Sequence, residues 1–500
     1  MDVFSNLILG FSVALSPINL LYAMIGCVLG TLIGVLPGVG PVATLSMLLP
    51  TTYALPPVSA LIMLAGLYYG SQYGSSTTSI LVNLPGEPSS VVTMLDGYQM
   101  ALKGQAGPAL AVAALGSFFA GTVGTLLIAL FATPMTDMAL KFGPAEYVSL
   151  MILGLVGAVV LAHGSVVKAL AMIVLGLVLG LVGTDVNSGV IRFSAGIPEL
   201  SDGIGFVVIA MGMFGFGEVT LNLERKEHRS TGKKEPLRLW LTREEIRRVI
   251  PAVLRGTVVG SLLGVLPGGG PTIAAFSAYV LEKKVSRTPE RFGKGAIEGV
   301  AAPESANNAG AQTSFIPMLT LGIPTTATLA LMMGAMMIYN IQPGPQVMTT
   351  NPDLFWGLIA SMWVGNLMLL VLNLPLIRIW VVLLTIPYRM LYPAILVFCC
   401  IGAYSLNNNV FDVMMTGLFG LLGYVFGKLE CEPAPLLLGY ILGPLMEEFF
   451  RRALLLSHGD FLVFVASPIS CILLGLTALL LFVMFLPVIS KKRDVVFEDN

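Results

Sequence analysis

The stretch GTLIGVLPGVGP at residues 30–41 returns as GSLLGVLPGGGP at residues 260–271, with nine of the twelve positions identical. Chance would give about one or two identities at this composition. Each copy ends in P-G-x-G-P, and residues of these two types interrupt a helix because proline lacks a backbone N–H and glycine is conformationally free. A broken apolar helix is tolerated in a membrane where its irregular backbone faces protein or a cavity. The two copies therefore predict broken or re-entrant membrane helices.

A second, weaker match follows each copy and indicates that the repeat is longer than the motif. At an offset of 236, five residues of the first half have identical partners in the second half. Both copies then end in Gly-x-Pro followed by two hydroxyl residues. We infer an internal duplication with core motifs at residues 30–90 and 260–326. The matched residues are Gly74, Thr77, Ile80, Gly86 and Pro88, paired with Gly310, Thr313, Ile316, Gly322 and Pro324.

The composition supports a membrane protein. Hydrophobic residues make up 56% of the 500 residues and charged residues only 11%, whereas soluble domains carry about 25% charged residues. This balance excludes a soluble enzyme and a disordered chain, and the net charge of −1 offers no footprint for nucleic acid. Apolar windows of about 20 residues, the length that crosses a bilayer, recur along the chain. They predict an all-α polytopic membrane protein with about ten to twelve transmembrane helices plus broken or re-entrant helices.

One basic segment divides the chain into two halves. Residues 224–255 carry ten Lys and Arg residues against five acidic ones. We therefore take residues 223–255 as a cytoplasmic linker between an N-terminal half, residues 1–222, and a C-terminal half, residues 256–500. Basic residues at 491–493 place the C-terminus in the cytoplasm, whereas the uncharged approach to the first motif places the N-terminus in the periplasm, so the two repeats have inverted topology. Four basic residues fit this scheme poorly: Lys141, Arg192, Arg451 and Arg452.

Inverted repeats with interrupted helices are typical of secondary transporters, whose sites lie near the membrane midplane where the repeats meet. The breaks free backbone N–H groups at the starts of half-helices, which favours an anion such as a carboxylate. One helix terminus contributes about 0.3–2 kcal/mol, so several must converge. The alternative is that the glycines serve only close helix packing. The predicted substrate-binding residues are Gly38, Gly40, Pro41, Ser89, Ser90, Gly268, Gly270, Pro271, Thr325 and Thr326.

Polar residues near the breaks are candidates for a coupling cation. Glu304 is the central one, because a carboxylate inside a membrane is costly and marks an ion path; the alternative is a surface carboxylate near Glu298. Serines and threonines can instead bond to the preceding helical turn. Glu87 pairs with Ile323 at the offset of 236, so any role of Glu87 breaks the symmetry. The predicted coupling residues are Ser75, Thr77, Asn83, Glu304, Asn307, Asn308 and Thr313.

The repeated G-V-L-P-G-x-G-P motif, the sequence APESANNA at residues 302–309 and LGIP at residues 321–324 carry a resemblance to a known family. The chain resembles the large membrane subunit of the tripartite tricarboxylate transporter family from about residue 15 to residue 490. At the variable position of the P-G-x-G-P loop the two copies differ, since the second copy has Gly269 and the first has Val39. The glycine-proline loops and polar hairpin tips of that family fall on the substrate-binding residues named above.

The resemblance implies a carrier of the bacterial inner membrane that imports citrate-like or aromatic di- and tricarboxylates by cation symport. Its implied partners are a small four-helix membrane subunit and a periplasmic solute-binding protein, with a homodimer of the complex as a further expectation. Na⁺ or H⁺ is the expected coupling ion, and no other metal and no cofactor is expected. The chain has no Walker motif for ATP.

Three other readings stay open at this stage. A stand-alone carboxylate carrier needs neither partner protein, and a passive channel is insensitive to ion gradients. A membrane-embedded enzyme is disfavoured, because the chain contains no H-E-x-x-H and no G-x-S-G sequence.

From the residues alone we expect Thr325→Val with Thr326→Val to leave folding intact while weakening uptake, and Glu304→Gln to alter cation dependence.

Overall fold

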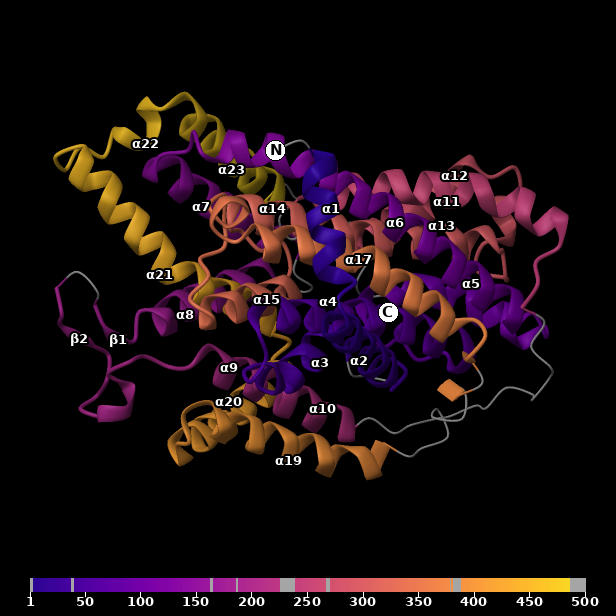
Figure 1. Cartoon of the computed structure of the whole chain (residues 1–500), viewed down its shortest axis with the longest axis horizontal. Coiled ribbons are helices and arrows are strands. Elements are labelled where there is room, and N and C mark those ends of the chain that lie inside the picture. The colour runs from indigo at the N-terminus through magenta and orange to yellow at the C-terminus, as the bar shows by residue number, and fades with distance from the viewer. Residues whose placement is uncertain are drawn as a thin grey trace.

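The computed structural model describes residues 3–36, 40–161, 165–185, 188–224, 239–266, 270–377, 379–380 and 388–485. These residues are helical almost throughout (Figure 1). Within them the only strands are β1, Gly183–Thr184, and β2, Ile191–Arg192, which pair in antiparallel fashion. The expected all-α polytopic fold is confirmed.

The first copy of the repeat begins with a broken helix. Pro17, Pro41 and Pro57 each stand in the first turn of a helix, where the missing N–H has no partner to lose. The helix α4 then crosses the interior almost fully buried and stops at Val82. The helices of this part are α1 Val3–Ala14, α2 Pro17–Gly34, α3 Pro41–Leu48, α4 Pro57–Val82, α5 Val91–Leu102 and α6 Ala106–Ala139.

The second copy repeats this order with longer arms. Its first helix starts with a capping box, in which the Thr242 side chain accepts from the backbone N–H of Glu245 and the Glu245 side chain accepts from the N–H of Thr242. The helix that corresponds to α4 is divided at Ser314. The helices are α11 Arg243–Gly264, α12 Gly270–Val285, α13 Glu298–Thr313, α14 Phe315–Leu321, α15 Ala327–Ile338, α16 Val347–Thr350 and α17 Pro352–Asn373.

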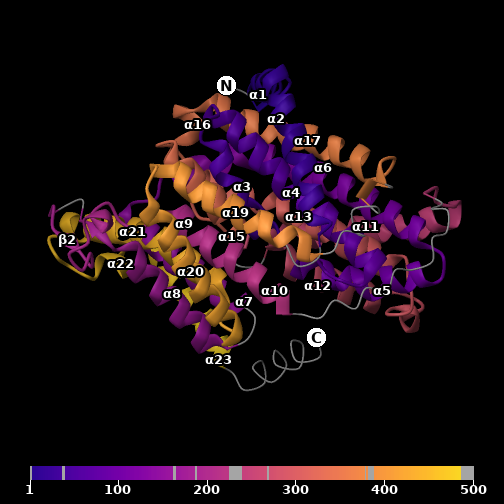
Figure 2. The same cartoon turned by 90° about the horizontal axis from the view of Figure 1, so that it is seen from below.

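The remaining helices include α8, α21 and α22, which lie on the side of the molecule opposite α11, α12 and α13, as both Figure 1 and Figure 2 show. Among the remaining helices α21 packs on α8, α23 packs on α7, and α20 packs on a π-helical turn, Met211–Gly217, that joins α9 to α10. These helices are α7 Pro144–Leu161, α8 Val166–Gly180, α9 Phe206–Ala210, α10 Glu218–Glu224, α19 Tyr388–Asn407, α20 Val410–Lys428, α21 Pro433–Leu456, α22 Val463–Ala466 and α23 Pro468–Phe485.

The two copies share one packing pattern, a row of glycines set against backbone carbonyls. A Cβ atom at Gly30 would lie 2.4 Å from the carbonyl oxygen of Leu67, and one at Gly260 would lie 2.2 Å from that of Ala306. Only glycine allows helices to approach so closely. On α2 and α4 the contacts are Gly26 with Met63, Gly30 with Leu67 and Gly34 with Ser71; on α11 and α13 they are Gly256 with Ala302, Gly260 with Ala306 and Gly264 with Gly310.

These contacts correct the register of the second part of the repeat. The glycines correspond at an offset of 230, as the motif predicts, but their partners correspond at 239 rather than 236. The backbone at the second break agrees. Asn83 (φ 58, ψ 34) corresponds to Gly322 (φ 70, ψ 27), and Glu87 (φ −146, ψ 160) corresponds to Thr326 (φ −138, ψ 160). Pairing Glu87 with Ile323 was therefore wrong.

The error has a simple origin in the prolines. The first copy holds both Pro85 and Pro88 near the break, and matching identical residues selects Pro88 as the partner of Pro324. The helix end selects Pro85, which stands two residues beyond the left-handed residue as Pro324 does. Ser89 and Ser90 consequently lie three residues beyond the positions of Thr325 and Thr326.

Four of the described helices are long and apolar enough to cross a membrane by length and composition: α2, α6, α17 and α20. Shorter apolar helices accompany them, among them α8, α15 and α23. Apolar side chains also cover much of the outer surface; Leu262 on α11 is 68% exposed. The number of ten to twelve crossings stays a prediction.

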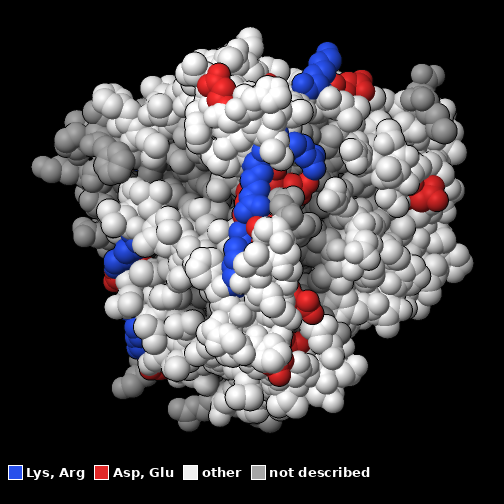
Figure 3. Space-filling view, turned by 90° about the vertical axis from the view of Figure 1, so that its left-hand side faces the viewer, with Lys and Arg blue, Asp and Glu red and all other residues white. Residues whose placement is uncertain are grey.

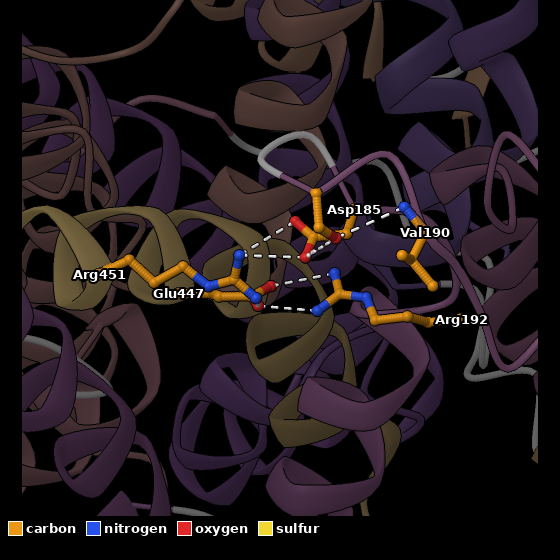
Figure 4. Close-up of polar contacts among 6 residues, drawn as sticks. Asp185, Val190, Arg192, Glu447 and Arg451 are labelled. Carbon is orange, nitrogen blue, oxygen red and sulfur yellow. Dashed lines mark hydrogen bonds and ion pairs between the residues drawn. The ribbon is translucent and has the colours of Figure 1, made fainter.

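A charged cluster holds the β1–β2 hairpin to α21 (Figure 4). Arg192 binds Glu447 through two hydrogen bonds of 2.7 and 3.1 Å, and Arg451 bridges Glu447 at 2.5 Å and Asp185 at 3.0 Å. Figure 3 views the face with the hairpin and α21, where acidic and basic side chains gather in one band among uncharged residues. Arg192 and Arg451 are thus paired with carboxylates.

Candidate functional site

All four helix breaks meet at one pocket of about 550 Å³. Residues beside both glycine-proline motifs line it, and so do the residues of both second breaks. A second part of the lining comes from outside the core motifs, from the π-helical turn, from α20 and from the start of α21. The lining includes Gly40, Pro41, Gly86, Glu87, Ser89, Gly270, Pro271, Thr325 and Thr326 from the breaks, and Met213, Phe214, Gly423, Gly427, Glu432 and Pro433 from this second part.

Helices begin at the pocket wall in both copies. Gly40 has an extended backbone and precedes Pro41, the first residue of α3, while α12 begins at Gly270 and α15 at Ala327. The first N–H groups of a helix have no partner within the helix and carry its positive dipole end. The wall therefore offers N–H donors to an anion, and none of the described residues that line it is Lys or Arg.

Most of the predicted substrate-binding residues lie in this pocket. Gly40, Pro41 and Ser89 line it from the first copy, as do four residues of the second copy, Gly270, Pro271, Thr325 and Thr326. Ser90 does not line it. Its hydroxyl is fully buried behind the wall, 2.8 Å from that of Ser75 and 2.9 Å from that of Ser79. Gly38 and Gly268 lie outside the described residues.

The two threonines of the second break differ in their contacts. Thr326 is the N-cap of α15, and its hydroxyl accepts from the backbone N–H of Leu329 at 3.2 Å. The Thr325 hydroxyl is buried at the pocket wall and has no hydrogen-bond partner among the described residues. A buried hydroxyl without a partner is costly, and a bound anion would supply an acceptor. The expectation that replacing both threonines with valine spares folding stays a prediction, and the loss of the Thr326 cap should cost about 1 kcal/mol in stability.

Two polar residues that sequence reasoning left out of the site also line the pocket. Glu87 accepts a hydrogen bond from Ser89 and another, of 3.1 Å, from the Asn307 side chain on α13. Gln72 on α4 is 1% exposed, and neither end of its amide makes a hydrogen bond with a described residue. The polar run around Gln72 was visible in the sequence, but which of its members faces the pocket depends on how α4 is rotated.

Glu304 lies deep in the contact between the copies rather than at the surface. It is 1% exposed and accepts hydrogen bonds from Ser76 on α4, at 2.7 Å, and from Thr93 on α5, at 2.5 Å. The surface alternative was wrong, because Glu304 is buried, whereas Glu298 is the carboxylate that binds Arg248, at 2.7 Å. Helices α4 and α5 of the first copy thus hold the carboxylate of the second.

The other predicted coupling residues divide into two groups. Asn307 and Asn308 lie one turn from Glu304, and the Asn308 amide donates to Ser117 on α6 at 2.6 Å. Thr77 borders a very small cavity beside Glu304, although its hydroxyl bonds to the carbonyl of Tyr73. The remaining three do not join Glu304. Ser75 bonds Ser90, Thr313 bonds the carbonyl of Ala309, and Asn83 is the exposed left-handed residue that ends α4.

Interrupted helices that meet at a pocket inside a polytopic membrane protein define the broken-helix class of membrane transporters. A comparison with family models identifies the member of this class. The model of the Tripartite tricarboxylate transporter TctA family matches residues 20–438, so the chain belongs to that family. It is therefore the membrane subunit of a tricarboxylate transporter that works in a system of three parts.

Two relatives from Agrobacterium vitis are similar to the chain. One, described as an uncharacterized 52.8 kDa protein in the TAR-I ttuC' 3' region, is 58% identical over 500 residues and spans all of both chains. The other, described as an uncharacterized protein in the TAR-II ttuC' 3' region, is 60% identical over 241 residues, 48% of this chain and all of the relative. No solved structure matches the chain.

Proposed function

We propose that this protein is the permease subunit of a binding-protein-dependent secondary transporter that imports di- and tricarboxylates, citrate-like or aromatic, by cation symport. The observation that carries the proposal is the convergence of four helix breaks on one pocket. Helix starts and hydroxyls supply donors for carboxylate oxygens there without a buried basic side chain, as in other carriers with broken helices. Thr325, with its unpartnered hydroxyl, is the proposed direct contact to the cargo.

The pocket lies between two copies that we propose are inverted repeats. In such carriers the site sits at the repeat interface near the bilayer midplane, and access alternates by movement of one part against another. This arrangement suits a pocket with one wall from the repeats and the other from α20, α21 and the π-helical turn. Movement of the repeats against that second wall would open the pocket to either side.

Coupling to a cation has an energetic reason. A dianion that enters a cell with a negative interior works against about 4.6 kcal/mol per 100 mV, since each charge contributes about 2.3 kcal/mol. Co-transported Na⁺ or H⁺ cancels that term. We propose that the buried carboxylate Glu304, with Asn307 and Asn308, belongs to the coupling site, because no described lysine or arginine forms a salt bridge with it.

The remaining parts of the proposal concern the assembly. The chain would lie in the inner membrane with its N-terminus in the periplasm and its C-terminus in the cytoplasm. It would work with a small four-helix membrane subunit and a periplasmic solute-binding protein, in a complex that dimerises. The family description, which names a tripartite system, supports the two partners.

Uptake by reconstituted vesicles tests the proposal. The chain is reconstituted alone and with both partner proteins, and uptake of labelled citrate and of an aromatic dicarboxylate is followed with and without an ion gradient. We expect saturable uptake that needs the partners and falls when the gradient is collapsed. Uptake by the chain alone would favour the stand-alone carrier, and uptake that ignores the gradient would favour the passive channel.

A further inference from the structure

The pocket wall is chemically unequal in the two copies. At the residue that precedes the second helix of the break, the second copy has Thr326 and the first has Glu87, in the same backbone conformation. Glu87 lines the pocket and is 7% exposed. A carboxylate at this place would repel an anionic cargo. At the effective dielectric of a protein, unit charges a few ångströms apart weaken binding by about a hundredfold or more.

The partners of Glu87 are suited to a protonated carboxyl group. Asn307 donates from Nδ2 to Oε1 of Glu87 at 3.1 Å, while Oδ1 of the same amide is buried and has no hydrogen-bond partner among the described residues. A carboxyl and an amide form two parallel hydrogen bonds when the acid carries a proton, because the O–H then donates to the amide oxygen. The unpartnered Oδ1 supplies the acceptor that a proton on Glu87 Oε2 would need.

We propose that Glu87 is a proton-carrying residue of the pocket: it takes one proton from water before a carboxylate cargo binds and returns that proton to water after the cargo leaves. This inference rests on the proposed function and names the coupling ion as H⁺. Protonation removes the negative charge from the wall, and Asn307 holds the proton while the cargo is present. Glu304 then remains a buried group behind the wall rather than a group that faces the cargo.

Other titratable groups lie near Glu87 and enter the prediction. Tyr68 on α4 lines the same pocket, and Glu304 on α13 lies one turn from Asn307, which donates to Glu87. Glu432, at the start of α21, lines the same pocket. Ser89 and Asn307 donate to the Glu87 carboxylate. Glu432 is the matched control, since it is another glutamate at the pocket but comes from outside the repeats.

Substitution by glutamine imitates the protonated state. In Glu87→Gln, Oε1 can still accept from Ser89 and Asn307, and the new amide N–H can donate to Asn307 Oδ1, so the fold should be retained. Citrate binding to the purified full chain is measured between pH 5 and pH 8 for the parent protein, Glu87→Gln, Glu87→Asp and Glu432→Gln. Dividing the parent affinity by that of Glu87→Gln cancels the titration of citrate itself.

The direction of the pH dependence follows from the coupling between proton binding at Glu87 and cargo binding. If the cargo binds only when Glu87 is protonated, the affinity ratio is constant at low pH and falls about tenfold per pH unit above the midpoint of the group. Glu87→Asp should keep this fall with a displaced midpoint, and Glu432→Gln should keep it unchanged. Parallel pH profiles for the parent and Glu87→Gln would overturn the proposal. Binding that needs NaCl rather than choline chloride and loses this need in Glu87→Gln would overturn H⁺ in favour of Na⁺.

Infrared difference spectra on a pH step, recorded without cargo, make the inference testable by itself. The carboxyl band that disappears as the pH rises should have the same intensity in the parent and in Glu432→Gln and a lower intensity in Glu87→Gln. Equal intensity in the parent and in Glu87→Gln would show that another group gives the whole band and would overturn the assignment. If the parent shows the band but binds no carboxylate, the proposed transport function fails while Glu87 remains a titrating group.

Discussion

The two copies of the repeat are alike where backbones touch and different where polar side chains meet. Both set a row of glycines on α2 or α11 against carbonyls of α4 or α13, at constant offsets. Yet Glu304 of the second copy corresponds to Ala65 of the first at the offset of 239, and Thr326 corresponds to Glu87. The glycine contacts thus give the two copies the same backbone geometry, whereas the polar side chains at corresponding positions differ.

The largest expected effect breaks the shared packing. In Gly30→Leu and Gly260→Leu the new side chain meets a backbone carbonyl that cannot move aside, so each should cost about 3 kcal/mol or more. We expect both variants to yield little folded protein, and to a similar extent, as measured by monodisperse yield in detergent and by melting temperature. Gly417→Ala on α20 is the control, because a Cβ atom there meets nothing within 4 Å. A stable Gly260→Leu with a lost Gly30→Leu would show that the two rows are not equivalent.

Removing the free hydroxyl of the second copy should come next in size. Thr325→Val keeps the shape of the wall but removes a donor to the cargo, and a hydrogen bond to a charged group contributes about 1.5–3 kcal/mol. The citrate dissociation constant should rise about tenfold or more, as measured by isothermal titration. Thr320→Val is the matched control, since the Thr320 hydroxyl bonds only within its own helix, to the carbonyl of Ile316. Equal affinities for the two variants would remove Thr325 from the binding site.

Glu304→Gln tests the polar contact between the copies. Glutamine can accept from only one of Ser76 and Thr93 through its oxygen, so we expect a loss of about 1 kcal/mol in stability together with a changed cation dependence of uptake. Melting temperature and uptake at varied Na⁺ and pH give the two readouts. A lower melting temperature with unchanged cation dependence would assign Glu304 to structure.

The smallest effect concerns the helix cap. Thr326→Ala should lower stability by about 1 kcal/mol, because α15 loses its N-cap, whereas Thr326→Ser should keep the cap and the parent melting temperature. Citrate affinity measured on both variants separates capping from binding. Weaker binding in Thr326→Ala alone, with equal melting temperatures, would contradict a role limited to the cap.

Much of this architecture could be predicted, because it depends on residue types with strong physical preferences. The apolar composition predicts the membrane fold, and paired proline and glycine residues predict the breaks at Gly40 and Gly270. Convergence of those breaks followed from the duplication. The register of the second break could not be read correctly, because Pro85 and Pro88 are equally good partners for Pro324 until the helix end is known.

The polar contacts of the site were harder to foresee. Ser76 and Thr93 reach Glu304 only because α4 and α5 of one copy pack on α13 of the other, more than 200 residues away in sequence. No sequence pattern predicts the part of the pocket that the π-helical turn and α20 line either, because both lie outside the repeat. Such contacts depend on tertiary packing, which residue spacing does not encode.

The glycine rows also set a limit on how the gene for this protein can change. Every single-base substitution in the first two bases of a glycine codon introduces a side chain or stops the chain, and at these six positions a Cβ atom alone would fall within about 2.2–2.4 Å of a carbonyl oxygen. In a saturation library selected for uptake, no substitution should therefore survive at every fourth residue, at 26, 30 and 34 and again at 256, 260 and 264. Two sets of positions that tolerate no substitution, with the same spacing in both halves, would show the duplication in the mutational data.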